Sequence, residues 1–285
     1  MRLVPTRRTM RLEGVELAEF LAIRQTDASL LGCLLRRLAG KVTLGTAELA
    51  AGVGFFQTDD PLVRKRPISG PAAVEKLAEG VESEAALICS GTATGKAFRE
   101  DATLPFRFKR WLFAIAGQPE PLAGIHAALA NSLPSYLKRS AKGDSAAEAL
   151  FLTFLARLRD SGKLDDMDVD AQTSARAFAA AVGEAERAFE QLGKPLPPLA
   201  AVVTNGRVMI GLCRGHPLHL GTFDGLVPCA RCEIGPGSSE LDPRVRSHKL
   251  LRAAMLASGE APAVEGFREL SEGEIVAVPR TLQIQ

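Results

Sequence analysis

The Asn205-Gly206 pair, set between two strand-like runs, constrains the fold of this chain more than any other short feature. LAAVVT precedes the pair and RVMIGLC follows it, and both runs are rich in apolar and β-branched residues. Asn-Gly adopts the positive φ angles of a tight two-residue turn, so the segment predicts an antiparallel β-hairpin. Two apolar runs far upstream, Ala86–Cys89 and Trp111–Ile115, are bounded by turn residues and predict buried strands.

Helical patterns separate these strand-like blocks. Residues 144–159 form an amphipathic pattern behind an Asp or Ser start, and residues 170–192 are Ala-rich up to a PLPP segment. Near the N-terminus, a leucine stripe follows the possible caps Thr26 and Asp27, and Gly40 ends that helix. Further strands are predicted at Leu17–Arg24, 52–57, 62–66, 218–223 and 274–278, and shorter helices at 71–80 and 122–133. Residues 244–258 fit a helix or a strand. Strands, then helices, then strands predict an α+β fold in which helices are layered on sheets.

Composition narrows the class of protein. The chain has 285 residues, 46% hydrophobic and 24% charged, which is typical of an ordinary globular protein. A net charge of +2 and the lack of a long basic run give no indication of binding to nucleic acid or to a membrane surface. No apolar segment approaches the roughly 20 residues needed to span a bilayer.

The ends of the chain and its cysteines give a further expectation. Residues 1–16 carry four arginines without clear periodicity, lack the apolar middle of a signal peptide, and are interpreted as an extension ahead of one domain spanning 17–285. Five cysteines, an odd number, argue against a disulfide scaffold and for a reducing compartment. We therefore expect a soluble cytoplasmic protein, with no nucleic-acid or membrane partner.

Five segments occur along the chain in a recognisable order: AGVGFF, RKRP, TATGKAFREDATLPF, WLFAIAG and GDSAAEALFLTFLARL. In their order and approximate spacing, and in the TNGR hairpin of the β-rich C-terminal part, the chain resembles the class II glutamine amidotransferases of the N-terminal-nucleophile hydrolase superfamily. The resemblance covers most of residues 17–280. It implies a four-layer α/β/β/α sandwich.

The resemblance also implies what an active site of this family needs. An N-terminal Cys attacks the glutamine amide and its own α-amino group acts as the base, because a thiol with a pKa near about 8.5 needs a base close by. An Asn side chain and a Gly N–H stabilise the oxyanion, while an Arg and an Asp hold the substrate's carboxylate and amine.

Most of these groups are replaced when the family's motifs are placed on this sequence. At five positions the family has Cys, Arg, His, Asn and Asp. This chain has, in the same order, Ala18, Gly91, Leu104, Ala116 and Ala146. Gly117 and Glu148 are the same residue types as in the family's motifs. We therefore expect no catalytic and no substrate-binding residues. The sequence predicts a catalytically inactive amidotransferase-like protein that acts as a binding, scaffolding or regulatory module with an unidentified protein partner.

Cys33 offers an alternative nucleophile. If the chain were cleaved after Gly32, Cys33 would carry a free amine, and the protein could be an active glutamine amidotransferase, a glutaminase or another γ-glutamyl amide hydrolase. The neighbouring arginines, Arg36 and Arg37, would lower the pKa of its thiol. Against this, cleavage would remove the first strand and cut a predicted helix, and a helix Cys often behaves as a small hydrophobe.

A second group of reactive side chains lies in LCRGHPLHLGTFDGLVPCARC. Two thiolates spaced as Cys-x-x-Cys can reach one ion from a tight turn, and a hairpin could bring a Cys or His opposite them. The candidate metal ligands are Cys213, His216, Cys229 and Cys232. This pattern is half of a complete zinc motif, so the alternatives are a structural zinc, a redox dithiol, or reduced cysteines at strand ends without metal. No other cofactor is expected.

Overall fold

The fold was analysed in a computed structural model, which describes residues 17–44, 50–70 and 73–285; the predicted extension, residues 1–16, lies outside the described part. Within these ranges the strands form a seven-stranded and a five-stranded sheet. All strand pairs in both sheets are antiparallel.

The seven-stranded sheet combines strands from the N-terminal and C-terminal parts of the chain, with strand order β11-β9-β10-β1-β4-β2-β3. Its strands are β1 (Glu19–Gln25), β2 (Ala51–Gln57), β3 (Asp60–Arg66), β4 (Ala85–Ser90), β9 (Leu218–Asp224), β10 (Arg252–Ser258) and β11 (Phe267–Glu269). The first strand therefore lies in the middle of the sheet, between β4 and the C-terminal β10.

The five-stranded sheet contains the predicted Asn-Gly hairpin, which is confirmed. Its strands, in spatial order, are β12 (Ile275–Val278), β8 (Met209–Arg214), β7 (Leu199–Thr204), β6 (Trp111–Gly117) and β5 (Phe106–Phe108). At the turn, Gly206 has a φ of +85°. The side-chain oxygen of Asn205 accepts hydrogen bonds from the backbone N–H groups of Arg207 and Val208 at 3.0 and 2.9 Å. These bonds fix the hairpin register.

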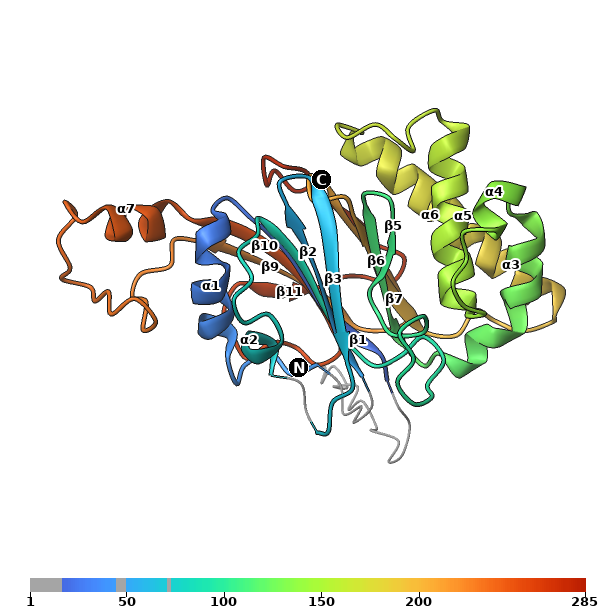
Figure 1. Cartoon of the computed structure of the whole chain (residues 1–285), viewed down its shortest axis with the longest axis horizontal. Coiled ribbons are helices and arrows are strands. Elements are labelled where there is room, and N and C mark those ends of the chain that lie inside the picture. Colours follow the sequence, from blue (N-terminus) through green and yellow to red (C-terminus); the bar gives the residue numbers. More distant parts are fainter. Residues whose placement is uncertain (1–16, 45–49, 71–72) are drawn as a thin grey trace, which may run out of the picture.

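Helices cover the outer face of each sheet, so the molecule has four layers (Figure 1). The seven-stranded sheet is covered by η1 (Ala28–Leu30), α1 (Leu31–Leu38) and α2 (Val74–Leu77). The five-stranded sheet is covered by η2 (Glu120–Ile125), α3 (His126–Ser132), α4 (Ser135–Lys138), α5 (Ala146–Asp160) and α6 (Ala171–Gln191). The predicted four-layer α/β/β/α sandwich is confirmed.

The burial of β1 shows how one strand serves two layers. Every residue of β1 is buried. Phe20 and Ala22 belong to the large core that includes the five-stranded sheet, whereas Leu21 and Ile23 belong to the core beneath α1. Successive side chains of a strand point to opposite faces, so the centre of a strand between two apolar layers, here residues 20–23, is apolar on both faces.

The region that fitted either a helix or a strand contains one of each. Helix α7 (Pro243–Leu250) begins at Asp242, whose side chain accepts from the N–H of Arg244, and β10 follows it. Three short elements were not predicted: α4, β5 and β11. Among the described residues, no helix combines the length and apolarity needed to cross a membrane.

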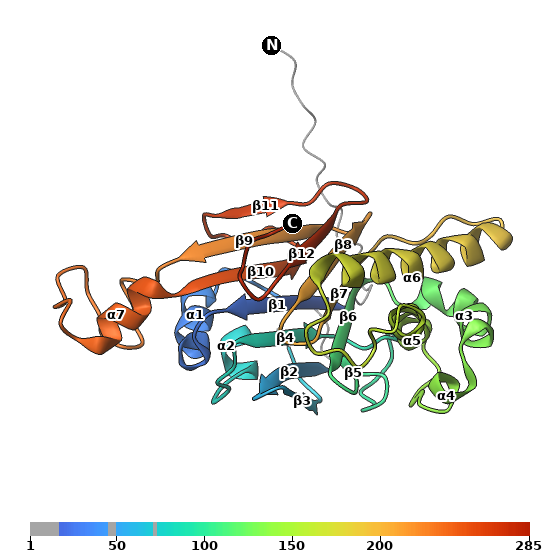
Figure 2. The same ribbon diagram turned by 90° about the horizontal axis from the view of Figure 1, so that it is seen from above.

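The chain between β9 and β10 leaves the sheet as an arm, residues 225–251, which ends in α7 and projects beyond the end of the sandwich (Figure 2). Only Val245 and His248 of α7 are buried. Two large apolar side chains of the arm, Leu241 and Leu250, are 85% and 70% exposed. We call this segment the β9–β10 arm.

Candidate functional site

The position that the resemblance assigns to the nucleophile lies where the two sheets meet. Ala18 immediately precedes β1 and forms an isolated antiparallel bridge with Gly117, the last residue of β6. The N–H of Ala18 donates to the carbonyl of Gly117 at 3.1 Å, and the N–H of Gly117 donates to the carbonyl of Ala18 at 3.0 Å. The backbone donor that the family directs at an oxyanion is thus hydrogen-bonded within the protein.

Gly91, at the position of the family's Arg, lies against Ala18. Its φ is +87°, and a Cβ placed on it would lie 3.0 Å from the Cα of Ala18. Positive φ is unfavourable for residues with a side chain, and that contact is with backbone that cannot rotate away. A side chain at this position is therefore disfavoured by both conformation and space.

Gly117 has its own conformational reason to be glycine. Its φ is +117°, and a Cβ would lie 2.6 Å from the carbonyl oxygen of Pro198. Ala116, beside it at the position of the family's Asn, is buried and pairs with Ala200 of β7. Ala18, Gly91, Ala116 and Gly117 therefore meet as a tightly packed corner of small residues.

Glu148, the acidic residue that matches the family, holds the loop before α5 by hydrogen bonds. Ser145 caps α5 by accepting from the N–H of Glu148 at 3.1 Å. The two carboxylate oxygens of Glu148 accept hydrogen bonds from the N–H groups of Lys142 and Gly143 at 2.9 and 2.8 Å. Both oxygens are thus occupied by backbone donors ahead of the helix.

A small pocket of about 190 Å³ lies beside this loop, lined in part by Lys65, Lys142, Glu148 and Phe106. The Lys65 ammonium donates to the carbonyl of Glu100 at 2.7 Å and lies 5.7 Å from the centre of the Phe106 ring. Burial lowers the pKa of Lys65, and the nearby Lys142 lowers it further. The pocket has cationic and acidic groups but no thiol or hydroxyl nucleophile engaged with a base.

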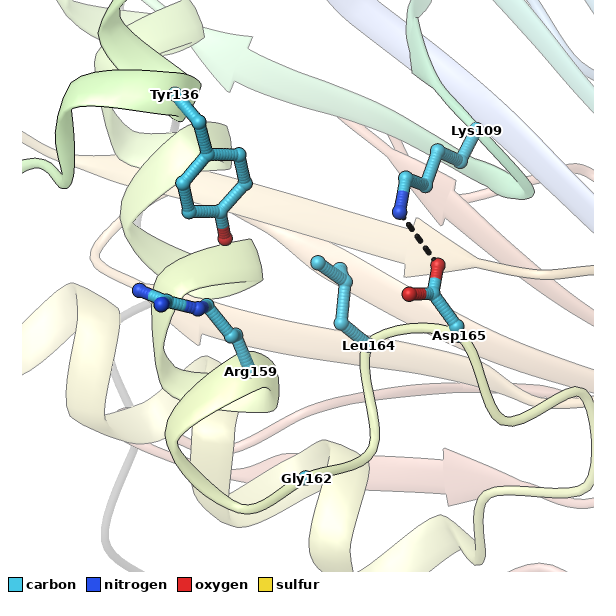
Figure 3. Close-up of a pocket in the computed structure, with 6 residues that line it drawn as sticks. All are labelled: Lys109, Tyr136, Arg159, Gly162, Leu164 and Asp165. Carbon is cyan, nitrogen blue, oxygen red and sulfur yellow. Dashed lines mark hydrogen bonds and ion pairs between the residues drawn. The ribbon is translucent and has the colours of Figure 1, made fainter.

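A larger pocket, of about 390 Å³, lies at the other end of β6 (Figure 3). Lys109 forms an ion pair with Asp165 at 2.6 Å, and the Arg159 guanidinium lies 4.9 Å from the centre of the Tyr136 ring. Lys109 precedes the strand that Gly117 ends, so this pocket is on the order of 20 Å from the corner at Ala18. It is therefore separate from the site that the resemblance identifies.

A cluster of three cysteines and one histidine is the most concentrated reactive group in the part of the chain that the structure describes. Cys33 from α1, Cys229 and Cys232 from the β9–β10 arm, and His248 from α7 each offer one ligand atom, and these atoms all lie within 4.8 Å of one another. The Cys33 and Cys232 sulfurs are 3.4 Å apart, and all five cysteines of the chain are free thiols. We call these four residues the Cys₃His cluster.

The cluster contains half of the metal ligands predicted from sequence. Cys229 and Cys232 belong to it, whereas Cys213 and His216 do not. Cys213 lies near the end of β8, beside the β8–β9 turn, and its sulfur is 3.4 Å from the backbone carbonyl oxygen of His216. Cys213 and His216 lie before β9, whereas Cys229 and Cys232 lie after it. The seven residues of this strand therefore hold the first pair on the order of 20 Å from the second.

Two members of the cluster, Cys33 and His248, were not predicted as ligands. They are far from the Cys-x-x-Cys segment in sequence, and the helix that carries His248 was itself ambiguous. Sequence reasoning also expected the arginines near Cys33 to lower the pKa of its thiol. In the structure, burial and, to a smaller extent, contact with the Cys232 thiol raise the pKa of Cys33 to about 12.

The fold has known counterparts. No family model matches the sequence, and no curated protein matches it significantly. A glutamine aminotransferase class-II domain protein from Silicibacter pomeroyi matches with a TM-score of 0.53 at 15% identity, over 94% of this chain and 98% of that one. A predicted glutamine amidotransferase from Pseudomonas aeruginosa matches with a TM-score of 0.51 at 15% identity, over 93% and 97%. At this identity the likeness establishes one thing: the chain has the mixed α/β fold, with two antiparallel sheets, of the N-terminal-nucleophile-type glutamine amidotransferases.

Proposed function

We propose that this protein is a catalytically inactive relative of the class II glutamine amidotransferases and acts as a binding or regulatory module for another protein. The observation that carries the proposal is a backbone hydrogen bond: the N–H of Gly117 donates to the carbonyl oxygen of Ala18 at 3.0 Å. In an active enzyme of this kind, that N–H would have to be available for the oxyanion of the reacting amide.

The surrounding residues support the same conclusion. Ala18 offers no thiol, and Gly91 has no side chain to hold a substrate carboxylate. Loss of a single oxyanion donor costs about 10²–10³ in rate, so loss of the nucleophile, its amine and the donor together leaves no route to amide attack.

The alternative nucleophile, Cys33, gains no support. It lies on α1, in the core outside the seven-stranded sheet, rather than between the sheets. Its raised pKa keeps the thiol protonated at neutral pH. No Cys33 thiolate is therefore placed against the corner formed by Ala18 and Gly117.

The β9–β10 arm is the surface that we assign to the partner. Leu241 and Leu250 are the two most exposed large apolar side chains among the described residues, and both lie on this arm. Exposed apolar groups on a projecting segment favour protein association. As part of the same proposal, we place the protein in the reducing cytoplasm, where its free thiols would be maintained.

Two measurements test the proposal. Purified full-length protein is incubated with glutamine, and glutamate and ammonia are measured beside an active class II enzyme as the positive control. We expect no release above buffer from the wild type or from Cys33→Ser. Release that disappears in Cys33→Ser, with an intact mass showing a chain that begins at Cys33, would replace this proposal with the hydrolase alternative.

A further inference from the structure

The Cys₃His cluster assembles from three segments that are distant in sequence. Cys33 lies on α1, Cys229 and Cys232 lie early in the β9–β10 arm, and His248 lies near the end of α7. Zinc bonds of about 2.3 Å to sulfur and 2.0 Å to nitrogen in a tetrahedron place ligand atoms about 3.5–3.8 Å apart. The ligand atoms of the cluster lie within 4.8 Å of one another, so small side-chain movements suffice to close this geometry.

The Cys-x-x-Cys segment folds as a tight turn. Cys229 and Ile234 exchange two backbone hydrogen bonds, of 2.9 and 3.0 Å, which close the turn around Cys232. Glu233, which follows the second cysteine, has a φ of +56° and reverses the chain there. This backbone presents both sulfurs toward Cys33 before any ion is bound.

His248 is oriented as a metal ligand. Its Nδ1 lies 2.7 Å from the backbone carbonyl oxygen of Arg244. A carbonyl oxygen only accepts, so Nδ1 carries the proton and the lone pair is on Nε2. That Nε2 is fully buried and has no hydrogen-bond partner. An unpaired buried acceptor is unfavourable, and the carbonyl that fixes the tautomer is the arrangement usual for metal-binding histidines.

We propose that Cys33, Cys229, Cys232 and His248 form a tetrahedral site for a structural Zn²⁺ ion that fastens the β9–β10 arm to α1. Three thiolates and one imidazole are a donor set that zinc prefers. The protein supplies all four ligands and leaves no position for water or substrate, which is the arrangement of a structural site. On binding, the ion takes the place of the thiol protons, which pass to solvent.

Charge around the cluster supports the assignment. Zinc with three thiolates carries a net charge of −1, so cationic neighbours would stabilise the loaded site. A pocket of about 440 Å³ that is lined by Cys33 and Cys229 is also lined by one acidic residue, Glu233, and by four basic ones: Arg36, Arg37, Lys41 and Arg231. The Arg231 guanidinium fills the space beside Gly32, since a Cβ there would lie 1.3 Å from one of its nitrogens.

The early part of the arm is anchored in the core beneath α1 by Leu226 and Ile234, whereas α7 has fewer buried side chains to hold it. Only Val245 and His248 of α7 are buried, so one apolar side chain anchors the helix. A disulfide between Cys33 and Cys232 would also link the arm to α1. It would leave Cys229 and the buried Nε2 of His248 without partners, so the metal accounts for more of the geometry.

Metal content tests the proposal directly. Full-length protein expressed with zinc and purified under reducing conditions is analysed for bound metal, and metal-free protein is titrated with Co²⁺ alone. We expect about one zinc per chain, and visible absorption typical of tetrahedral cobalt with a thiolate charge-transfer band. Cys232→Ser and His248→Ala should lose the metal, whereas Cys213→Ser and His216→Asn, which change residues outside the cluster, should retain it.

A chelator test on the wild type covers the case in which a ligand variant fails to fold. Removing zinc should lower the melting temperature and speed hydrogen exchange in residues 225–251, with recovery on adding zinc, while the β7–β8 hairpin keeps its protection. Absence of metal, equal loss in Cys213→Ser, or a chelator effect spread over the whole chain would each overturn the proposal. Isolation of a Cys33–Cys232 disulfide from a chain that binds neither zinc nor cobalt would assign the cluster to redox chemistry instead.

Discussion

Ala18 and Gly117 exchange two backbone hydrogen bonds, of 3.1 and 3.0 Å, and these bonds join the start of β1 in one sheet to the end of β6 in the other. The contact has a structural consequence, because it closes the sandwich at this corner. It also has a chemical consequence, because it occupies a backbone donor that amide hydrolysis on this fold would need.

Gly91→Ala tests how tightly that corner is closed. The substitution places a Cβ at a φ of +87° and 3.0 Å from the Cα of Ala18. We expect the free energy of unfolding to fall by about 1–3 kcal/mol, measured by urea denaturation. Gly183→Ala is the matched control. Gly183 lies inside α6, where a Cβ would make only ordinary contact with Arg187 at 3.5 Å.

The control should change stability in the opposite direction. Alanine is favoured over glycine inside a helix, so Gly183→Ala should raise the free energy of unfolding by about 0.5–1 kcal/mol. If Gly91→Ala leaves stability unchanged, the corner has room for a side chain, which contradicts the close packing of Gly91 against Ala18.

Glu148→Gln tests whether the acidic residue shared with the family is structural. In the wild type, the backbone N–H groups of Lys142 and Gly143 donate to the two carboxylate oxygens of Glu148 at 2.9 and 2.8 Å. A glutamine keeps one acceptor oxygen but turns an NH₂ group toward one of these two donors. We expect a loss of about 1.5–3 kcal/mol in unfolding free energy, because hydrogen bonds to a buried charged group are lost. Thermal and urea unfolding would measure it.

Asp165→Asn is the control for this prediction. Its carboxylate pairs with Lys109 at 2.6 Å, but Asp165 is largely exposed. Surface ion pairs contribute about 0–1 kcal/mol, so this variant should unfold close to the wild type. Equal effects of the two substitutions would show that Glu148 is no more than a surface charge.

His216 predicts an acid dependence of stability. Burial, together with a smaller contribution from the neighbouring His219, lowers its pKa from 6.5 to about 4. Between these values the unfolded chain binds a proton that the folded chain does not, so stability present above pH 6.5 is lost as the pH falls toward 4. The loss amounts to about 3 kcal/mol, at about 1.4 kcal/mol per pH unit.

The comparison that isolates this histidine is His216→Asn. Unfolding free energies of the wild type and the variant are measured from pH 7.5 to 4, and their difference removes the contribution of the carboxylates. The variant should lose about 3 kcal/mol less than the wild type over this range. Parallel curves would show that His216 is protonated in the folded protein.

Paired substitution of Leu241 and Leu250 by Ser tests the surface assigned to the partner. Both side chains are mostly exposed, so the variant should fold with the stability of the wild type. It should lose most of the partner recovered by affinity capture from the native cell extract, as measured by quantitative mass spectrometry. Leu192→Ser, which alters an exposed leucine elsewhere, should retain the partner. Loss in that control, or retention in the arm variant, would remove the arm from the proposal.

Most helices and strands could be predicted from the sequence because the signals that begin or join them are local. The turn at Asn205 and Gly206, the Asp27 cap ahead of α1 and the Ser145 cap of α5 each act within a few residues, and the structure confirms the elements that they begin or join. The same reasoning missed β5 and β11, which have three residues each and depend on pairing with a neighbouring strand.

Two of the four residues of the Cys₃His cluster could be predicted for the same reason. Cys229 and Cys232 are three residues apart, so their spacing alone indicates a shared site. Cys33 and His248 reach them only after β1 and β10 pair in the centre of the sheet and bring α1 beside the arm. Proximity in sequence favoured His216 instead, but the length of β9 separates it from the cysteines. A distant histidine at a helix end could be weighed only once the tertiary fold was known.

The two ends of the β9–β10 arm are adjacent. Asp224 pairs with Arg252 across β9 and β10, and the N–H of Gly225 donates to the carbonyl of Leu251 at 2.7 Å. The arm therefore enters and leaves the sheet at a single point, like the loop of a hairpin that has been greatly lengthened. Within that loop, Leu226, Ile234 and Val245 are buried in the core beneath α1, so the arm is an integral part of this outer layer and not an appendage that could be cut away.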